Sequence, residues 1–223
     1  MSGFDVRRRI AAEGLGTGLL VCTVVGSGIM ATSLTSQVGL ALLANAVATA
    51  AMLVVLIAVL GPVSGAHFNP VVSFVLALRS ELPRRELPGY VLAQLLGGVS
   101  GTVLAHLMFS APAVSVAVNV RTGGAQWLSE AVAAFGLVFV ILMGARSARG
   151  AVPWLVGLYI LAAYWFTAST SFANPAVAIA RMLTNSFAGI RPLDVPGFVV
   201  AEVVGALAAS AVFSWFTAER RPT

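Results

Sequence analysis

Asparagine followed by proline occurs twice in this sequence, at Asn69-Pro70 and at Asn174-Pro175. This pair begins a helix, because the Asn side chain accepts hydrogen bonds from free backbone N–H groups and Pro suits the first helical position. Each copy continues for only about ten apolar residues, too few to cross a bilayer core of about 30 Å. A half-helix at membrane depth is tolerated only where it lines a watery cavity or is buried in protein. Two of them indicate a pore.

The two boxes also predict what such a pore would accept. If the half-helices meet head to head, the positive end of each helix dipole, about half a charge, faces the pore centre. Asn69 and Asn174 would add amide N–H donors there. A neutral solute with oxygen acceptors is then favoured, whereas a cation, including hydronium, is repelled. The alternative, that both Asn residues only cap helices, leaves the second copy unexplained.

The elements that position these boxes are six apolar segments, which predict an all-α membrane protein with six transmembrane helices and two re-entrant half-helices. They run over residues 10–31, 39–60, 88–110, 129–145, 153–170 and 197–216. The 223 residues are 59% hydrophobic and only 9% charged, which excludes an ordinary soluble domain. We expect one channel domain over residues 1–223 and no cleavable signal peptide.

This domain is an internal repeat, with one copy at about 10–110 and the other at about 129–216. Gln94 and Gly97 in the first copy match Glu202 and Gly205 in the second, 108 residues later. Each copy holds three spans, an odd number, so the second copy enters the membrane inverted. Inverted repeats with broken helices mark transport sites, and small residues within spans allow helices to approach closely.

The thirteen basic residues are all Arg, and their distribution predicts the orientation. With the N-terminus in the cytoplasm, ten fall on the cytoplasmic side: Arg7, Arg8, Arg9, Arg79, Arg84, Arg85, Arg146, Arg149, Arg220 and Arg221. Only Arg121, Arg181 and Arg191 belong to outer segments. This asymmetry is the positive-inside bias, so the net charge of +5 reports topology and not nucleic-acid binding. We expect a multi-pass protein of the plasma (inner) membrane with both ends in the cytoplasm.

The paired boxes, together with Ser64-Gly65-Ala66-His67-Phe68 before the first box and Ala12-Glu13-Gly14-Leu15-Gly16-Thr17 near the start, resemble the aquaporin and aquaglyceroporin (major intrinsic protein) family. The resemblance covers about residues 9–216. It implies a right-handed aquaporin-like bundle, one pore per subunit of a homotetramer, and passive conduction of small uncharged solutes. It implies no cofactor, and the sequence itself has no nucleophile–base pairing, phosphate loop or metal-ligand cluster. An enzyme is not expected.

The resemblance also implies a selectivity filter of four residues outside the Asn-Pro boxes. Carried over without gaps, these positions fall on Thr49, Ala162, Ser171 and Val177, and a slip of one residue would substitute Leu161 or Ala163 for Ala162. Val177 stands where the family normally has Arg, and no aromatic residue or His narrows the site. Wide filters without Arg look like those of bacterial aquaglyceroporins associated with arsenic resistance. The implied solutes are water, glycerol, arsenite as uncharged As(OH)3, and methylated arsenicals.

Two residues beside the boxes leave alternatives open. Arg181 lies one helical turn after Val177, and residues four apart share a helix face, so it could reach back and supply the missing charge. Otherwise it belongs to the vestibule. Val71 fills the third place of the first box, where the second box has Ala176. We expect a tolerated packing change there, and an effect on selectivity is the alternative.

Two carboxylates and one His are the remaining candidates. By the resemblance, Glu13 and Glu130 hydrogen-bond the backbone of the two re-entrant loops, whose N–H groups need partners in a membrane. A proton relay is the alternative. We expect His67 to hold the first loop in place, with a pH gate as the alternative.

Two functions of other classes fit the same sequence. A proton-coupled secondary transporter of a small solute would also show inverted repeats and buried Glu residues, but its flux would saturate and collapse with an uncoupler. A closed structural membrane-junction protein would show no solute flux at all. The small residues at the expected filter argue against the closed form.

Overall fold

The computed structural model describes residues 3–218, and the regular secondary structure of this part of the chain is helical. Its α-helices are α1 (Val6–Leu34), α2 (Val38–Ser64), α3 (Pro70–Leu78), α4 (Leu87–Met108), α5 (Gly124–Ser147), α6 (Val152–Phe166), α7 (Pro175–Arg181) and α8 (Val195–Thr217). Short 3-10 turns, η1 (Arg84–Glu86), η2 (Arg149–Ala151) and η3 (Pro192–Asp194), precede α4, α6 and α8. Arg220 and Arg221 lie outside the described residues.

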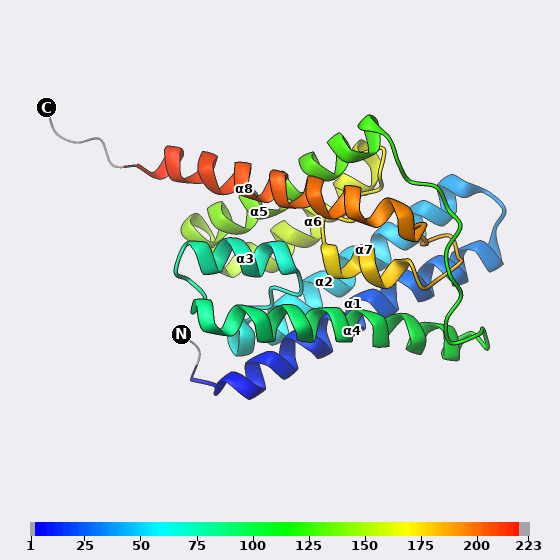
Figure 1. The fold of residues 1–223 in the computed structure, drawn as a ribbon, viewed down its shortest axis with the longest axis horizontal. Coiled ribbons are helices and arrows are strands. Elements are labelled where there is room, and N and C mark those ends of the chain that lie inside the picture. Colours follow the sequence, from blue (N-terminus) through cyan, green and yellow to red (C-terminus); the bar gives the residue numbers. More distant parts are fainter. Residues whose placement is uncertain (1–2, 219–223) are drawn as a thin grey trace, which may run out of the picture.

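Six long helices form a bundle, and the two short helices α3 and α7 lie among them (Figure 1). This confirms the predicted architecture of six spans and two half-helices. In the described part of the chain, five helices are long and apolar enough to cross a membrane on their own: α1, α2, α4, α5 and α8. The sixth, α6, has 15 residues and is therefore about 22 Å long. It ends at Phe166, earlier than expected, because the chain leaves the helix to form the second re-entrant loop.

Glycine brings the long helices together in both halves. α1 runs along α4, and α5 runs along α8 (Figure 1). A Cβ atom on Gly97 would lie 2.2 Å from the carbonyl oxygen of Gly14, and one on Gly205 would lie 2.0 Å from that of Ala131. These distances leave no room for a side chain, so the helices meet backbone to backbone. Since Gly97 and Gly205 occupy matching places, the two halves use the same contact.

The arginines separate toward the two ends of the bundle. α1 begins and α8 ends at the same end (Figure 1). There Arg9 pairs with Glu86, and the guanidinium of Arg79 contacts the hydroxyl of Ser214 on α8 at 3.2 Å. Arg191 belongs to the segment at the opposite end, where α8 begins. Each half contains three long helices, so the second half begins at the end of the bundle opposite to the one where the first half begins, as expected.

Candidate functional site

The two Asn-Pro boxes meet in the middle of the bundle, where α3 and α7 begin. Oδ1 of Asn69 accepts a hydrogen bond from the N–H of Val71 at 3.0 Å. Oδ1 of Asn174 accepts from the N–H groups of Ala176 and Val177 at 3.0 and 3.3 Å. Both Asn residues are therefore helix N-caps, and each following Pro opens its helix.

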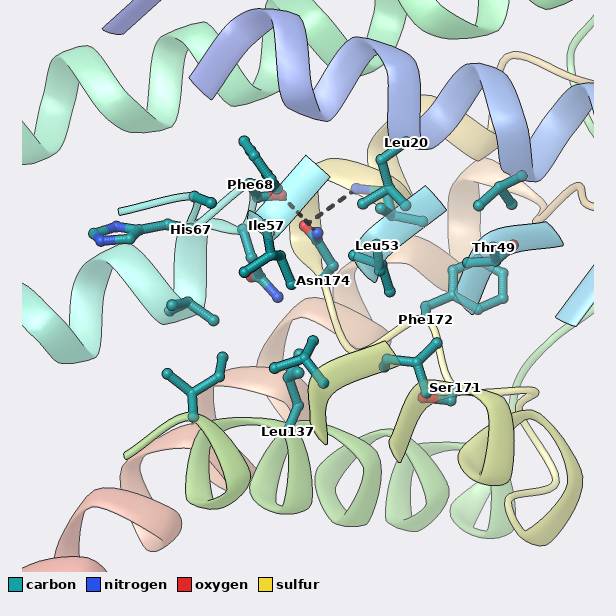
Figure 2. Close-up of a pocket in the computed structure, with 18 of the residues that line it drawn as sticks. Leu20, Thr49, Leu53, Ile57, His67, Phe68, Leu137, Ser171, Phe172 and Asn174 are labelled. Atoms are coloured by element: carbon teal, nitrogen blue, oxygen red, sulfur yellow. Dashed lines mark hydrogen bonds between the residues drawn. The ribbon is translucent and has the colours of Figure 1, made fainter. Parts of the chain in front are cut away.

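The same two side chains also join the boxes to each other. Nδ2 of Asn69 donates to the carbonyl oxygen of Ala173 at 2.7 Å. Nδ2 of Asn174 donates to the carbonyl oxygen of Phe68 at 2.8 Å (Figure 2). An amide nitrogen carries two hydrogens, so each Asn retains a second N–H. Both Asn side chains line the central cavity, which places that remaining donor at the pore centre.

The loop before each box has a left-handed backbone at the same three positions. The positive φ angles are 94° at Gly65, 51° at Ala66, 48° at Phe68, 63° at Thr170, 52° at Ser171 and 50° at Ala173. Each residue has its counterpart 105 positions away, as the boxes do. For residues other than Gly this conformation costs about 1–2 kcal/mol, and it persists where the surroundings enforce it. The repeat thus extends to the backbone, and both loops need outside support.

Glu13 on α1 supplies that support in the first half. Its Oε1 accepts from the N–H of His67 at 2.9 Å and the hydroxyl of Ser64 at 2.7 Å. Its Oε2 accepts from the N–H of Phe68 at 2.6 Å and Nε2 of Gln94 at 2.8 Å. Four donors satisfy this fully buried carboxylate. These are the contacts of a loop support, because both oxygens are occupied within the protein.

Glu130 on α5 repeats the arrangement in the second half, with one difference. It accepts from the N–H groups of Phe172 and Ala173 at 2.9 and 2.7 Å. Beside it lies the carboxyl group of Glu202, which accepts from the N–H of Asn174 at 2.9 Å. The first half has an amide, Gln94, in the place of Glu202. Both carboxyl groups are fully buried, and Oε2 of Glu202 has no hydrogen-bond partner among the described residues.

His67 takes part in the first loop through both its backbone and its ring. The backbone N–H bonds Glu13 as described, and Nδ1 lies 3.0 Å from the hydroxyl of Ser73. The ring packs 5.2 Å from that of Tyr90 and lines the cavity. These contacts agree with an anchoring role for His67.

A cavity of about 60 Å³ runs between these elements. Figure 2 shows His67 at one end, Asn174 midway, and Thr49, Ser171 and Phe172 at the other end, which we call the filter end. Its polar lining comprises Thr49, His67, Asn69, Tyr164, Ser171, Asn174 and Arg181, and its apolar lining includes Leu20, Val24, Leu53, Ile57, Leu137, Ile141, Val156 and Ile160. The volume suits a file of small molecules. Polar groups can replace part of the solute's hydration while the apolar side offers none.

Three of the four expected filter residues line this cavity, namely Thr49, Ser171 and Val177. The prediction for Ala162 is wrong, because this residue is exposed on the outside of α6. The side chain of α6 that reaches the filter end is Tyr164, whose hydroxyl donates to Oγ1 of Thr49 at 3.3 Å. Two residues turn a helix by about 200°, so the gapless transfer selected the opposite face. An aromatic residue therefore does narrow this site, contrary to expectation.

Arg181 lies at the last turn of α7, is 2% exposed and lines the cavity. Its guanidinium carbon lies 3.4 Å from the ring centroid of Phe172, and its Nε donates to the carbonyl oxygen of Ala188. A positive charge is thus present at the filter end although Val177 replaces the usual Arg.

Sequence reasoning missed Tyr164 and Phe172. Tyr164 could have been found from its spacing, since Val156, Ile160 and Tyr164 recur every four residues and share one face of α6. Phe172 could have been found from the repeat, since it stands 105 residues after His67 and beside Ser171.

The chain matches known proteins over its whole length. The family model described as "Major intrinsic protein" matches residues 1–164. The aquaglyceroporin AqpS of Rhizobium meliloti is 63% identical over 222 residues, which is 100% of this chain and 95% of the relative. Aquaporin Z of Bradyrhizobium diazoefficiens is 26% identical over 230 residues, covering 95% and 94%.

Among solved structures, the aquaglyceroporin from Plasmodium falciparum has the same fold, with a TM-score of 0.67 and 19% sequence identity over 94% of this chain and 96% of that one. The family model spans well over half of the chain, and AqpS resembles it from end to end. The protein is therefore a multi-pass membrane channel and not an enzyme. It belongs to the major intrinsic protein family.

Proposed function

We propose that this protein is an aquaglyceroporin that passively conducts water, glycerol-like solutes and uncharged metalloid hydroxides such as arsenite, including methylated arsenicals. The observation that carries the proposal is the cavity lined by both Asn caps, in which Val177 occupies the position where the family normally has Arg. The name of its relative AqpS supports the glycerol class.

The centre of the cavity favours neutral oxygen-bearing solutes. Asn69 and Asn174 bring two helix N-termini together, so two positive dipole ends and two free amide hydrogens face the lumen. A hydroxyl oxygen can accept from these donors, whereas a cation meets a barrier. No step of conduction needs a titrating group here, because Glu13 and Glu130 are occupied by the loops.

Size selection comes from the filter end. Val177 has a short apolar side chain, and Ser171 is smaller still, so this side of the opening is wide. Tyr164 also lines the cavity and is held by its hydrogen bond to Thr49, so its ring does not add to the width. We therefore place the extra width on the Val177 side alone. It gives room for a solute larger than water with an apolar group against Val177.

The test is a flux measurement on purified protein in liposomes. Stopped-flow shrinkage or uptake should show rapid water, glycerol and arsenite movement that does not saturate at low millimolar solute and is unaffected by an uncoupler. Collapse with the uncoupler would instead indicate a proton-coupled transporter. Empty-vesicle rates for all three solutes would indicate a closed structural protein, and our proposal would be wrong.

We further propose a homotetramer in the plasma (inner) membrane with both chain ends in the cytoplasm. Large apolar side chains cover the outside of the bundle, for example Leu92, Leu96 and Val200, and they would face lipid or neighbouring subunits. The arginines at the end where α1 begins support a cytoplasmic position for that end. Light scattering in detergent checks the mass, and labelling of a cysteine added near residue 3 checks the side.

A further inference from the structure

Arg181 is held in one orientation by three contacts. Its Nε donates to the carbonyl oxygen of Ala188, its guanidinium carbon lies 3.4 Å from the ring centroid of Phe172, and the side chain is almost completely buried. A guanidinium stacks well on an aromatic face, where the ring quadrupole attracts the charge. The group is thus fixed in place before any solute arrives.

The far side of this guanidinium is free. Arg carries five N–H donors, and only the one on Nε is used, because no acceptor among the described residues bonds Nη1 or Nη2. Neither nitrogen is among the described buried atoms that lack a partner, so both keep access to the cavity that Arg181 lines. The four N–H groups of Nη1 and Nη2 are therefore available to a solute at this end of the pore.

Among the residues that the structure describes, Arg181 also has no carboxylate partner at ion-pair distance. Within the described part of the chain, the ion pairs involve Arg8, Arg9, Arg79 and Arg191, and none involves Arg181. A second guanidinium, that of Arg121, lies 5.2 Å from the same Phe172 ring. Its side chain donates to the carbonyl oxygens of Gly189, Ser169 and Phe187, so it is committed to the loops. The filter end thus carries net positive charge.

We propose that Arg181, seated on Phe172, is the specificity-determining arginine of this pore, excluding cations and binding paired solute oxygens one helical turn away from Val177. The inference rests on the proposed channel function and adds the residue that distinguishes one solute from another. Four residues along a helix are about 6 Å, so the charge is displaced from the ring of Thr49, Tyr164 and Val177. Solutes are then selected by size at Thr49, Tyr164 and Val177, and by charge at Arg181. Neutral solutes with two neighbouring hydroxyl groups fit this fork best.

The test replaces Arg181 in two ways and uses a third variant as a control. Arg181→Gln removes the charge, and Arg181→Lys keeps it but loses the fork and the stacking. Arg191→Gln removes a charge at the same end of the bundle, but from a half-exposed residue that pairs with Asp194. Proteoliposomes report proton leak with an entrapped pH dye, and stopped-flow scattering reports the glycerol-to-water permeability ratio.

We expect Arg181→Gln to raise proton leak about tenfold or more and to lower the glycerol-to-water ratio several-fold. Arg181→Lys should keep the leak low and still lower the ratio. Arg191→Gln should match the unmodified protein in both. If a folded Arg181→Gln channel keeps both values, the inference is wrong while the channel function stands. If the unmodified protein conducts no solute, the channel function itself fails.

A variant that leaves Arg181 unchanged keeps the proposal testable if both Arg181 variants misfold. Phe172→Leu removes the aromatic surface under the guanidinium but keeps an apolar side chain of similar size. We expect the glycerol-to-water ratio to fall several-fold, because the fork is no longer held in place. Should both Arg181 variants fail to assemble, an unchanged ratio in Phe172→Leu overturns the proposal.

Discussion

The side-chain amide of Asn174 donates a hydrogen bond to the carbonyl oxygen of Phe68, 106 residues earlier, at 2.8 Å. Asn69 makes the reciprocal bond to Ala173 at 2.7 Å. Each amide therefore caps its own half-helix, holds the opposite loop and offers its last hydrogen to the lumen. Since the same amide group caps the half-helix, bonds the opposite loop and lines the lumen, separating the two boxes would also change the lining of the pore.

Asn174→Asp tests this arrangement. A carboxylate can still cap α7, but it cannot donate to Phe68 or to a solute, and it brings negative charge to the meeting point of two positive helix ends. We expect solute flux to fall at least several-fold and cation leak to rise. Asn185→Asp is a useful control, since Asn185 is exposed, lies outside the lining and uses Oδ1 to accept from the N–H of Val118, which Asp can also do. Unchanged flux in a folded Asn174→Asp channel would contradict the placement.

Glu202→Gln tests whether an amide can replace the carboxyl group that supports the second loop. Gln94 already occupies the matching place next to Glu13, so an amide should serve equally well: it can donate to Glu130 and accept from the N–H of Asn174. We expect stability within about 1 kcal/mol of the unmodified protein and near-normal flux. Glu202→Leu leaves that N–H unsatisfied and should cost about 1–3 kcal/mol. Thermal melting in detergent measures both.

The same reasoning applies to Glu130. Glu130→Gln should retain part of the folding and flux, whereas Glu130→Ala should impair assembly, because two loop N–H groups lose their acceptor. Loss of transport from a fully assembled Glu130→Gln or Glu202→Gln protein would instead favour a proton relay.

Gly97→Ala tests the backbone contact between α1 and α4. The added Cβ would lie 2.2 Å from the carbonyl oxygen of Gly14, and only separation of the helices can relieve the clash. Gly39→Ala is the control, because nothing lies within 4 Å of a Cβ there. We expect Gly97→Ala to lose at least about 2 kcal/mol of stability or to fail to assemble, while Gly39→Ala assembles normally. Size-exclusion chromatography separates the outcomes.

Local sequence was enough to predict the parts of the site that depend on short segments. The boxes, their caps and the support from Glu13 and Glu130 follow from Asn-Pro pairs, from short apolar runs and from the repeat. Local sequence could not identify Tyr164 instead of Ala162 as the lining residue, because the rotation of α6 depends on how the following loop is folded. The position of Arg181 depends on Phe172 and Ala188, which only the folded chain brings to it.

Val177→Arg tests the size argument at the filter end. The new guanidinium would stand in the opening beside Thr49 and Tyr164, one turn from Arg181. Like charges at this spacing repel, so the two side chains cannot share one site, and the added group must narrow the opening. We expect the arsenite-to-water permeability ratio to fall about tenfold, equivalent to about 1.4 kcal/mol in the barrier. The water permeability itself should fall less than the arsenite permeability.

Val177→Met separates size from charge, since it adds length without a guanidinium. Steric exclusion predicts that Val177→Met also lowers the arsenite-to-water ratio, though less than Val177→Arg, because Met can bend out of the way. A lost or gained hydrogen bond is worth only about 1 kcal/mol, whereas a blocked opening stops the larger solute altogether. If both folded variants keep the original ratio, residue 177 does not limit the opening, and the constriction must be assigned to Tyr164 instead.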